Sequence, residues 1–346
     1  MTRSAAPPYR TGTSTKSFAD QLSELGPVEL VRSYRSGIHE NSFYGSVVIL
    51  DRAGDVILQR GDVRRPVFHR SCAKPLQAIA MLELNAPLSG ADLALAAASH
   101  TGEAVHVRRT LDLLARNGFT EHDLGCPAAL PSDPASYRAA IRGDGGPRRA
   151  YMNCSGKHAA MLATCRIQDW SHQNYLAVDH PLQQRIREVI ERATGEVPAG
   201  VGIDGCGAPV YATSLVGLAR GFGTLATAEA GSAGNIVANA MRAYPELVGG
   251  TGVVDSRLMR TVDGLLVKGG ADGVHCAALP DGRSVALKIS DGSDQARIPV
   301  LIGALNGLGV GSGDNASREL LDELATGSVL GGGKPVGSLD IVPDLF

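Results

Sequence analysis

The chain lacks both an excess of charge and a long apolar segment. Its 346 residues carry 33 Lys and Arg against 35 Asp and Glu, so the net charge is −2 and the pI is about 6.5. This balance gives no reason to expect nucleic acid or an anionic membrane surface as a partner. No run approaches the roughly 20 apolar residues of a membrane span, and residues 1–25 contain no apolar core of signal-peptide length. We therefore expect a cytoplasmic protein.

Several common motifs are missing as well. There is no P-loop, and no Gly-x-Gly-x-x-Gly follows a convincing strand, so a nucleotide site is not indicated. The spacing of the cysteines fits no standard zinc motif. In a cytosolic chain of this length, cysteines are more typical of thiols or ligands than of a disulfide framework. The six cysteines are Cys72, Cys126, Cys154, Cys165, Cys206 and Cys276.

The motif around which we organise the chain is a serine followed three residues later by a lysine, Ser71 and Lys74. If a helix starts at Ser71, this spacing puts the hydroxyl and the amine on one face. A desolvated lysine can then serve as the base that a serine nucleophile needs at neutral pH. Ser-x-x-Lys is typical of serine β-lactamases and penicillin-binding proteins. The tetrapeptide alone is equally typical of a helix start with a surface lysine.

The order of elements favours the functional interpretation. Strand patterns lie at about 43–60, including a hairpin with an Ala53-Gly54 turn, and return at about 264–342. Helix patterns fill about 76–245, which leaves no place for βαβ crossovers. We predict an α+β fold with one antiparallel sheet built from both chain ends, helices packed on it and a helical region beside it. This is the layout of serine β-lactamases and penicillin-binding proteins, with Ser-x-x-Lys opening the central helix.

Finer boundaries follow from the same patterns. Residues 1–26, rich in Ser, Thr, Pro and Ala, predict a flexible tail, and 27–346 a single catalytic domain. Pro209 is expected to open a helix that runs to Ala219. The segments 125–149 and 245–260 are expected to be loops.

Three further segments contain candidate site residues. Ser99 and His100 precede Gly102 and Glu103 at a helix junction, where Ser99 fits either a helix cap or a second active-site serine. Lys288 ends an apolar strand. It fits an edge-strand lysine, a carboxylate-binding lysine as in the Lys-Thr-Gly triad of β-lactamases, or a second base for a serine.

The third segment type is a glycine turn with a cysteine. Cys154 precedes Lys157 and His158, and Asp204 and Gly205 precede Cys206. Each cysteine fits an ordinary buried residue. Backbone amides at such turns also favour an anion such as a substrate carboxylate, and two thiols with a nearby His or Lys amine can bind zinc.

Together these segments resemble the rhizobial-type L-asparaginases, also called the class 3 or asparaginase II family. The resemblance runs from about residue 27 to the C-terminus and rests on four motifs, around Arg70 to Pro75, Ser99 to Glu103, Asn153 to His158 and Gly202 to Gly207. It implies a β-lactamase-like fold, a homodimer, and hydrolysis of the small molecule L-asparagine to L-aspartate and ammonia.

The resemblance also implies roles for individual residues. Two Ser-Lys tandems are expected, Ser71 with Lys74 and Ser99 with Lys288, and a zinc site that supports substrate binding more than the hydrolytic step. The implied zinc ligands are Cys154, Lys157 and Cys206. The candidate substrate-binding residues are Arg70, His100, Lys157, His158, Asp204 and Gly205. Two alternatives stay open, namely a glutaminase or other serine amidohydrolase on the same fold, and a non-catalytic zinc-binding protein.

Overall fold

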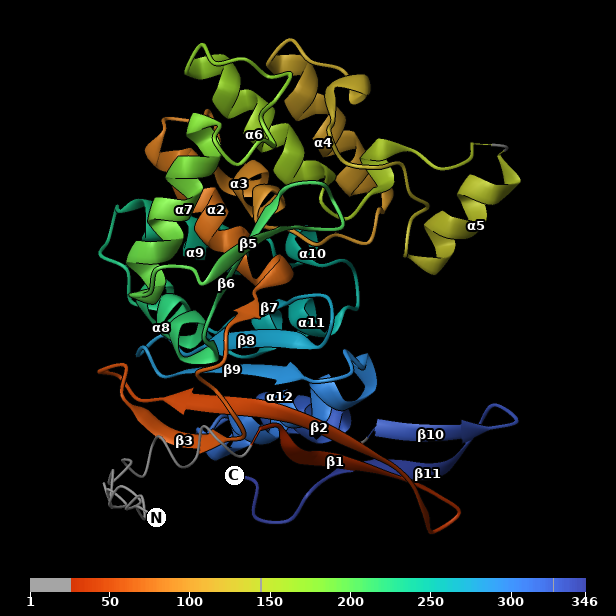
Figure 1. Ribbon diagram of the computed structural model, residues 1–346. Helices are drawn as coiled ribbons and strands as arrows, with labels where there is room; N and C mark the ends of the chain where they lie inside the picture. Colours follow the sequence, from red (N-terminus) through yellow and green to blue (C-terminus); the bar gives the residue numbers. More distant parts are fainter. Residues whose placement is uncertain (1–25, 144, 326) are drawn as a thin grey trace, which may run out of the picture.

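Both ends of the chain contribute strands to one antiparallel sheet. A computed structural model describes residues 26–143, 145–325 and 327–346, and Figure 1 shows this sheet below a mass of helices. The strand order is β10-β11-β1-β2-β9-β8-β7, and β3 pairs with the second half of β2. The strands are β1 Val28–Arg35, β2 Ile38–Leu50, β3 Val56–Arg60, β7 Leu266–Gly269, β8 Val274–Ala278, β9 Ser284–Ile289, β10 Gly327–Gly331 and β11 Lys334–Ile341.

The helices lie mostly in the middle of the chain. A small second sheet, β4-β6-β5, crosses this region with strands Val67–Phe68, Pro209–Thr213 and Gly200–Ile203. The helices are η1 Arg70–Ala73, α2 Lys74–Glu83, α3 Gly90–Ala96, α4 Ala104–Arg116, η2 Glu121–Asp123, α5 Pro134–Arg142, η3 Arg149–Tyr151, α6 Ser155–Ile167, α7 Pro181–Thr194, α8 Leu215–Ala226, α9 Ala233–Ala243, α10 Pro245–Val248, α11 Val254–Thr261, α12 Asp294–Gly307 and α13 Asn315–Ala325.

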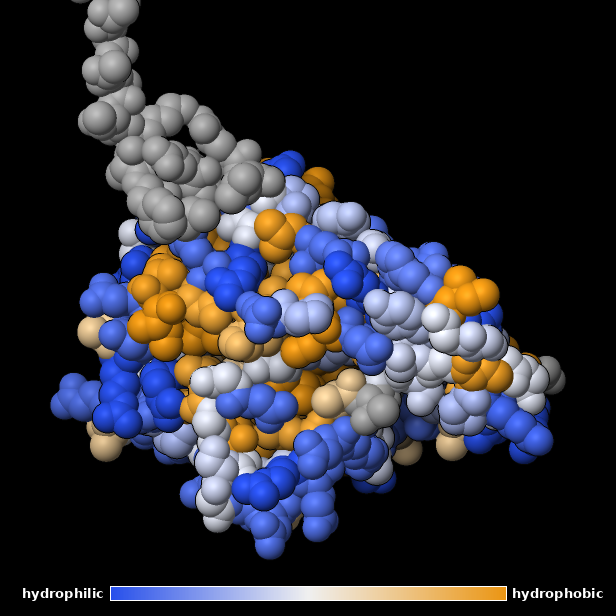
Figure 2. Space-filling view, turned by 90° about the horizontal axis from the view of Figure 1, so that it is seen from below, coloured by the Kyte–Doolittle hydropathy of each residue, from blue (hydrophilic) through white to orange (hydrophobic). Residues whose placement is uncertain are grey.

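The large sheet is covered on both faces. Helix α8 packs on β2, β8 and β9 from one side, while α12 packs on β1, β2, β9 and β11 from the other. All five residues of β8 are buried, as a strand covered on both faces requires. Seen from below, apolar residues gather in the middle of the molecule's underside and polar residues surround them (Figure 2). Among the described residues, no helix has both the length and the apolar character needed to cross a bilayer.

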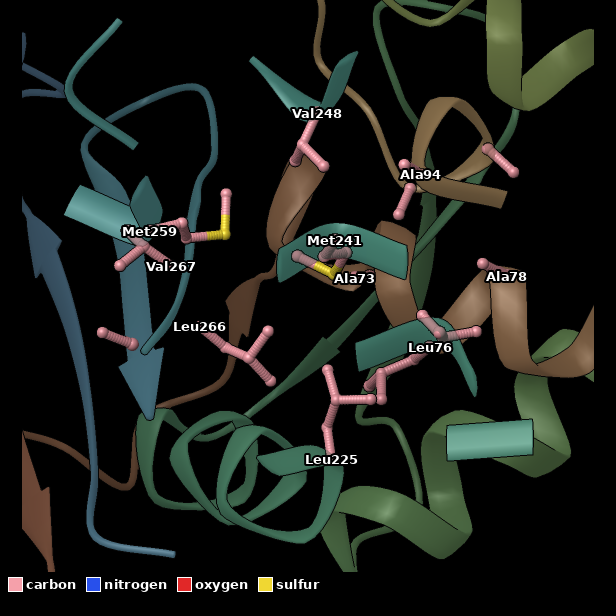
Figure 3. Close-up of a cluster of buried hydrophobic side chains, with 14 of the residues drawn as sticks. Ala73, Leu76, Ala78, Ala94, Leu225, Met241, Val248, Met259, Leu266 and Val267 are labelled. Atoms are coloured by element: carbon pink, nitrogen blue, oxygen red, sulfur yellow. The ribbon is translucent and has the colours of Figure 1, made fainter. Parts of the chain in front are cut away.

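The core that positions the site joins η1 and α2 to β7. Figure 3 shows Ala73 and Leu76 facing Leu266, with Met241 and Leu225 closing the cluster. These side chains are at most 2% exposed. Burial of a side chain such as Leu76 stabilises the fold by about 1.5–3 kcal/mol. This packing sets the start of α2 against the end of β7, which are far apart in the sequence.

The predicted α+β class is confirmed, as are the hairpin of β2 with β3 and the return of strands from about residue 264, where β7, β8 and β9 pair. The tail expected at 1–26 lies, except for residue 26, outside the described residues, and the single catalytic domain at 27–346 stays a prediction. The sheet is larger than predicted, since β1 and β10 were not expected. The homodimer also stays a prediction. A measurement of the molecular mass of the protein in solution would test it.

Three local predictions were wrong. The segment expected to be a helix from Pro209 begins as the buried strand β6, and α8 starts only at Leu215. The helix starts there because the Ser214 hydroxyl caps it by accepting a bond from the Gly217 amide at 2.9 Å. The loop expected at 125–149 contains α5, and the one at 245–260 contains α10 and most of α11. Helices as short as these present too few turns for an apolar period to be readable.

Two buried helix glycines give a matched test of this packing. A Cβ at Gly156 of α6 would lie 2.4 Å from Leu95 Cγ and 2.7 Å from its carbonyl oxygen, whereas a Cβ at Gly221 of α8 would meet no atom within 3.6 Å. We expect Gly156→Ala to lower the free energy of unfolding by about 1–3 kcal/mol. Gly221→Ala should leave it unchanged or raise it by up to about 1 kcal/mol. Denaturant unfolding of both variants measures this, and equal stabilities would contradict the close approach of α6 and α3.

Candidate active site

Two buried lysine amines meet on the hydroxyl of Ser99. Lys74 Nζ donates to Ser99 Oγ at 2.9 Å and to the Ala98 carbonyl at 2.6 Å. Lys268 Nζ lies 3.0 Å from the same Oγ and donates to the Gly269 carbonyl at 2.7 Å. Both lysines are at most 2% exposed. The backbone of Ser99 is fixed in turn, because its amide donates to the Val248 carbonyl at 2.8 Å.

The second lysine of this arrangement is Lys268, so the predicted pairing of Ser99 with Lys288 was wrong. Lys288 ends β9, two strands away from Lys268 on β7. Its amine donates to the carbonyls of Asp272 and Ile289, both at 2.6 Å, and it lines a cavity of about 500 Å³ with Arg70. Burial lowers the pKa of both amines, that of Lys268 to about 8.

Ser71 lies in η1, one turn before Lys74. Its hydroxyl makes no hydrogen bond with any residue that the structure describes, so it is available to a ligand. The residue before it, Arg70, has φ of +50°, a conformation that non-glycine residues seldom adopt. Gly270 lies against this turn. A Cβ at Gly270 would come within 3.1 Å of the His69 carbonyl and 3.2 Å of Cys72 Sγ, so a larger residue would push the end of β7 and η1 slightly apart.

The structure brings the two predicted cysteine segments together. Lys157 Nζ lies 3.2 Å from Cys206 Sγ, and the Cys154 and Cys206 thiols interact directly. A hydrogen bond from Cys206 holds the pKa of Cys154 well below its usual range, and the same contact raises the pKa of Cys206. Within the described chain, no three His, Cys, Asp or Glu side chains form a metal-binding group. The donor set here is instead two sulfurs and one amine nitrogen, which are ligand types that zinc accepts.

Asp204 connects this sulfur cluster to Ser71. Its Oδ1 accepts a bond of 2.8 Å from Arg70 Nε, and its Oδ2 lies 3.8 Å from Cys206 Sγ. Burial opposes the charge of Asp204, but Arg70 and Lys157 outweigh it and lower the pKa of this carboxyl. Arg70 pairs with Asp272 as well. Gly205 leaves room beside the guanidinium, since a Cβ there would meet Arg70 Nη2 only at 4.0 Å.

The two histidines have different surroundings. His100 Nδ1 accepts from the Gly102 amide at 3.1 Å, so its Nε2–H donates to Ser155 Oγ at 2.9 Å. Both ring nitrogens are therefore occupied within the protein, and a role of His100 in substrate binding stays a prediction. His158 Nδ1 bonds Tyr175 at 2.7 Å, while its buried Nε2 has no hydrogen-bond partner among the described residues. The Cys206 thiol interacts with this ring, so the imidazole faces the sulfur cluster.

Sequence reasoning missed Lys268 and the polar residues behind it. The available signal was Lys268-Gly269-Gly270, a lysine at the end of a strand followed by small residues, which is closer to a Lys-Thr-Gly pattern than Lys288 is. As a whole, the site offers the unbonded hydroxyl of Ser71 one helical turn before Lys74, which begins a hydrogen-bonded chain of amine, hydroxyl and amine. Such a chain can accept a proton from a nucleophile and pass it on, which is the requirement of acyl transfer.

Distant structural likenesses exist. A β-lactamase from Mycobacterium bovis shares 14% identity over 81% of this chain and 95% of that chain, with a TM-score of 0.39. EstCE1, a hydrolase with promiscuous acyltransferase activity, shares 10% identity over 89% of this chain and 95% of that chain, with a TM-score of 0.38. These scores are too low to carry an argument about fold or function.

Comparison of the sequence with known proteins identifies the family. A search of curated proteins finds no match. The family model described as L-asparaginase II matches residues 31–341, which contain every candidate site residue discussed above. The match covers most of the chain, so this protein belongs to the L-asparaginase II family.

Proposed function

We propose that this chain hydrolyses L-asparagine to L-aspartate and ammonia with Ser71 as the nucleophile. The observation that carries the mechanism is the hydrogen-bonded chain of Lys74, Ser99 and Lys268, together with the unbonded hydroxyl of Ser71 one helical turn before Lys74. Membership of the L-asparaginase II family supports the reaction. Besides the base Lys74, the chain contains two further groups that can transfer protons, Ser99 and Lys268. Two such groups suit a reaction in which an acyl-enzyme forms and is then hydrolysed.

The first step is the attack of Ser71 Oγ on the side-chain amide carbon of asparagine. In its neutral form Lys74 has two N–H groups, and the Ala98 carbonyl and Ser99 Oγ accept both of them. Its lone pair is then left for the proton of Ser71. The first amides of a helix have no acceptor within the helix, so amides at the start of η1 can stabilise the tetrahedral oxyanion.

Ammonia leaves in the second step and takes a proton. Lys74 can return the proton that it received, while Ser99 and Lys268 exchange protons with Lys74 through the bonds of 2.9 and 3.0 Å. Water then attacks the β-aspartyl ester, and the same groups accept its proton. Ser71 is released as the hydroxyl and aspartate leaves.

The charged groups around Ser71 suit an amino-acid substrate. The Asp204 carboxylate is a partner for the α-ammonium group. Arg70 already pairs with Asp204 and Asp272, so it holds Asp204 in place and can share a substrate carboxylate only by giving up part of those contacts. Lys157 and His158 Nε2 are the other candidates for the α-carboxylate or the amide.

Zinc is part of the proposal. Cys154, Cys206 and Lys157 would hold it, because their donor atoms converge and because the unpartnered Nε2 of His158 lies beside them. Lysine binds a metal only as the neutral amine, so binding releases protons. When bound, zinc supplies a positive charge that favours an anionic group of the substrate.

The assay that tests the function compares ammonia release from L-asparagine and from L-glutamine. A site built for the shorter side chain should release ammonia from asparagine and much less from glutamine. Ser71→Ala should lose turnover while its unfolding transition stays the same. Release mainly from glutamine would favour a glutaminase, and silence on both with zinc still bound would favour a non-catalytic zinc protein.

A pair of lysine variants tests the corrected tandem. We expect Lys268→Met to lower kcat by about 100-fold or more, since general acid–base groups contribute about 10²–10⁴-fold. Lys288→Met is the matched control, because it removes an amine of the same kind that binds only carbonyl oxygens. It should keep kcat within a few-fold. The reverse order of the two effects would restore Lys288 as the second base.

A cysteine variant tests the metal. Cys206→Ala should lower the zinc that copurifies with the protein and raise KM for asparagine more than it lowers kcat, since the metal is assigned to binding. Cys165→Ala is the control, as this buried thiol lies on α6 outside the cluster. Elemental analysis of both variants gives the metal content, and an unchanged zinc content in Cys206→Ala would remove the zinc proposal.

A further inference from the structure

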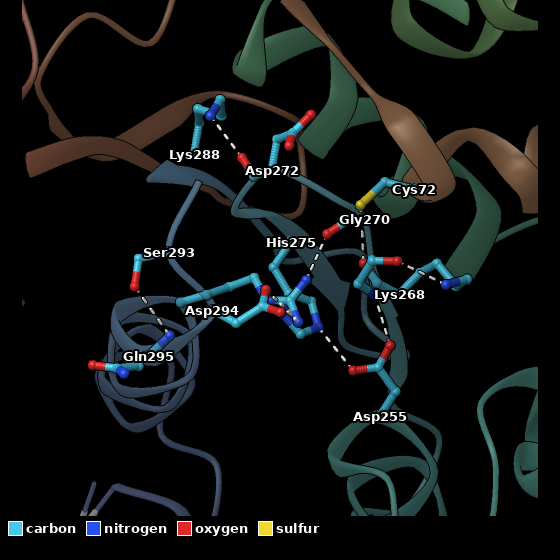
Figure 4. A network of polar contacts seen from close by, with 12 residues as sticks. Cys72, Asp255, Lys268, Gly270, Asp272, His275, Lys288, Ser293, Asp294 and Gln295 are labelled. Carbon is cyan, nitrogen blue, oxygen red and sulfur yellow. Dashed lines mark hydrogen bonds and ion pairs between the residues drawn. The ribbon is translucent and has the colours of Figure 1, made fainter. Parts of the chain in front are cut away.

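A buried acid–histidine pair lies directly behind the Lys268 amine and has no role in the steps above. Figure 4 shows Asp255, from the first turn of α11, with its carboxylate turned toward His275 of β8 and the end of β7. Its Oδ2 accepts from the Gly269 amide at 2.6 Å, and its Oδ1 accepts from His275 Nε2 at 2.9 Å. Asp255 and His275 are both buried. Burying a carboxylate is costly, so this position calls for an explanation.

The first contact fixes the peptide that carries the lysine. Gly269 follows Lys268, its amide is held by Asp255, and its carbonyl accepts from Lys268 Nζ at 2.7 Å. The same amine reaches Ser99 Oγ at 3.0 Å. A shift of the Gly269 peptide would therefore move both the backbone and one hydrogen-bond acceptor of Lys268, and the contact with Ser99 would change with them.

The second feature of the Asp255–His275 pair is its charge. His275 Nδ1 is buried without a partner in the described residues, and burial lowers the pKa of this imidazole, so the ring is neutral and orients Asp255 without cancelling its charge. Burial also opposes the charge of Asp255. His275, Lys268 and the Gly269 amide nevertheless lower the pKa of this carboxyl, so it remains ionised. The pair thus keeps one negative charge close to the amines that meet on Ser99.

The groups that face Lys268 come from four packed elements. They are Asp255 on α11, Lys74 on α2, Cys72 on η1 and Cys276 on β8. Arg297 of α12 faces His275 from the far side. Lys74 disfavours a proton on Lys268, since two ammonium groups sharing one hydroxyl repel each other. Asp255 is the carboxylate in this set, and it favours the protonated amine.

We propose that Asp255 and His275 are a positioning pair that fixes the Gly269 peptide, and with it Lys268 on Ser99, and that places a negative charge beside the Lys268 amine. This inference rests on the proposed function for its link to catalysis. Neither residue of the pair touches the substrate or a reacting atom.

The protonation of Lys268 can be measured directly because the chain has only six lysines, at positions 16, 74, 157, 268, 288 and 334. The ¹³C signals of labelled lysine side chains report the charge of each amine, and Lys268→Met assigns the signal of interest. Asp255→Asn removes the charge but keeps an oxygen for the Gly269 amide. We expect it to shift the titration of Lys268 to lower pH by about one unit or more, because it removes an opposite charge.

The pH dependence of kcat/KM on L-asparagine is measured alongside. Whether the reaction uses the charged or the neutral form of Lys268, the part of the kcat/KM profile that reports the titration of this amine should move to lower pH. His275→Gln can still donate to Asp255 and should keep the wild-type profile, whereas His275→Phe should shift it. The two histidine variants also keep the test available if Asp255→Asn fails to fold. Glu323→Gln is the charge control, since this exposed carboxylate of α13 pairs with Arg257 of α11, the helix that carries Asp255.

The outcomes separate this inference from the proposed function. The inference is overturned if the ¹³C signal of Lys268 titrates at the wild-type pH in Asp255→Asn. It is also overturned if that signal shifts while the pH profile of kcat/KM does not. A shifted signal in a protein that is inactive on asparagine even as wild type would support the control of Lys268 by Asp255 and count against the proposed function. A uniform loss of kcat with both titrations unchanged would mean that the pair is merely structural.

Discussion

The meeting of two lysine amines on one serine hydroxyl is the constraint on which the rest of the site depends. Taking an ammonium group out of water costs several kcal/mol unless it is bonded and paired. Lys74 and Lys268 are both buried, and the fold supplies each with the Ser99 hydroxyl and one backbone carbonyl. Because these carbonyls come from a helix end and a strand end, the positions of α3 and β7 decide whether the amines can be accommodated at all.

The sheet built from both chain ends provides those positions. Ser71 opens the helical region from η1, while Lys268 comes almost 200 residues later on β7, and apolar packing of Leu76 against Leu266 holds the two segments together. At this contact a Cβ at position 270 would push the end of β7 and η1 slightly apart, and Arg70 has a positive φ. Strained backbone of this kind persists only where its surroundings over-determine it, and it concentrates at functional sites.

The sequence predicted the class of fold and most of the site, but not how strands placed their residues. Ser71 and Lys74 could be paired from the sequence because their spacing puts them on one helical turn. Cys154 and Cys206 could be singled out because each lies in a turn that contains glycine. Lys268 and Lys288 each end an apolar strand, and periodicity alone does not tell which strand lies beside α2. The order β9-β8-β7 decides it in favour of Lys268. Asp255 was missed for a related reason, since its short helix lies in a segment with the glycine content of a loop.

The groups around Ser99 are arranged symmetrically, which is not apparent from the sequence around either lysine. Ser99 lies at the centre, Lys74 and Lys268 flank it, and each amine has one acidic side chain nearby. For Lys74 this group is the Cys154 thiol, whose low pKa arises from the Cys206 hydrogen bond and, less strongly, from Lys74 itself. For Lys268 it is Asp255. The two groups differ in kind, because a thiol can be taken up by a metal whereas the buried carboxylate remains a fixed charge. The sulfur cluster and the buried carboxylate therefore act on two amines that share one hydroxyl, so in the proposed mechanism a change on either side reaches the same proton-transfer step.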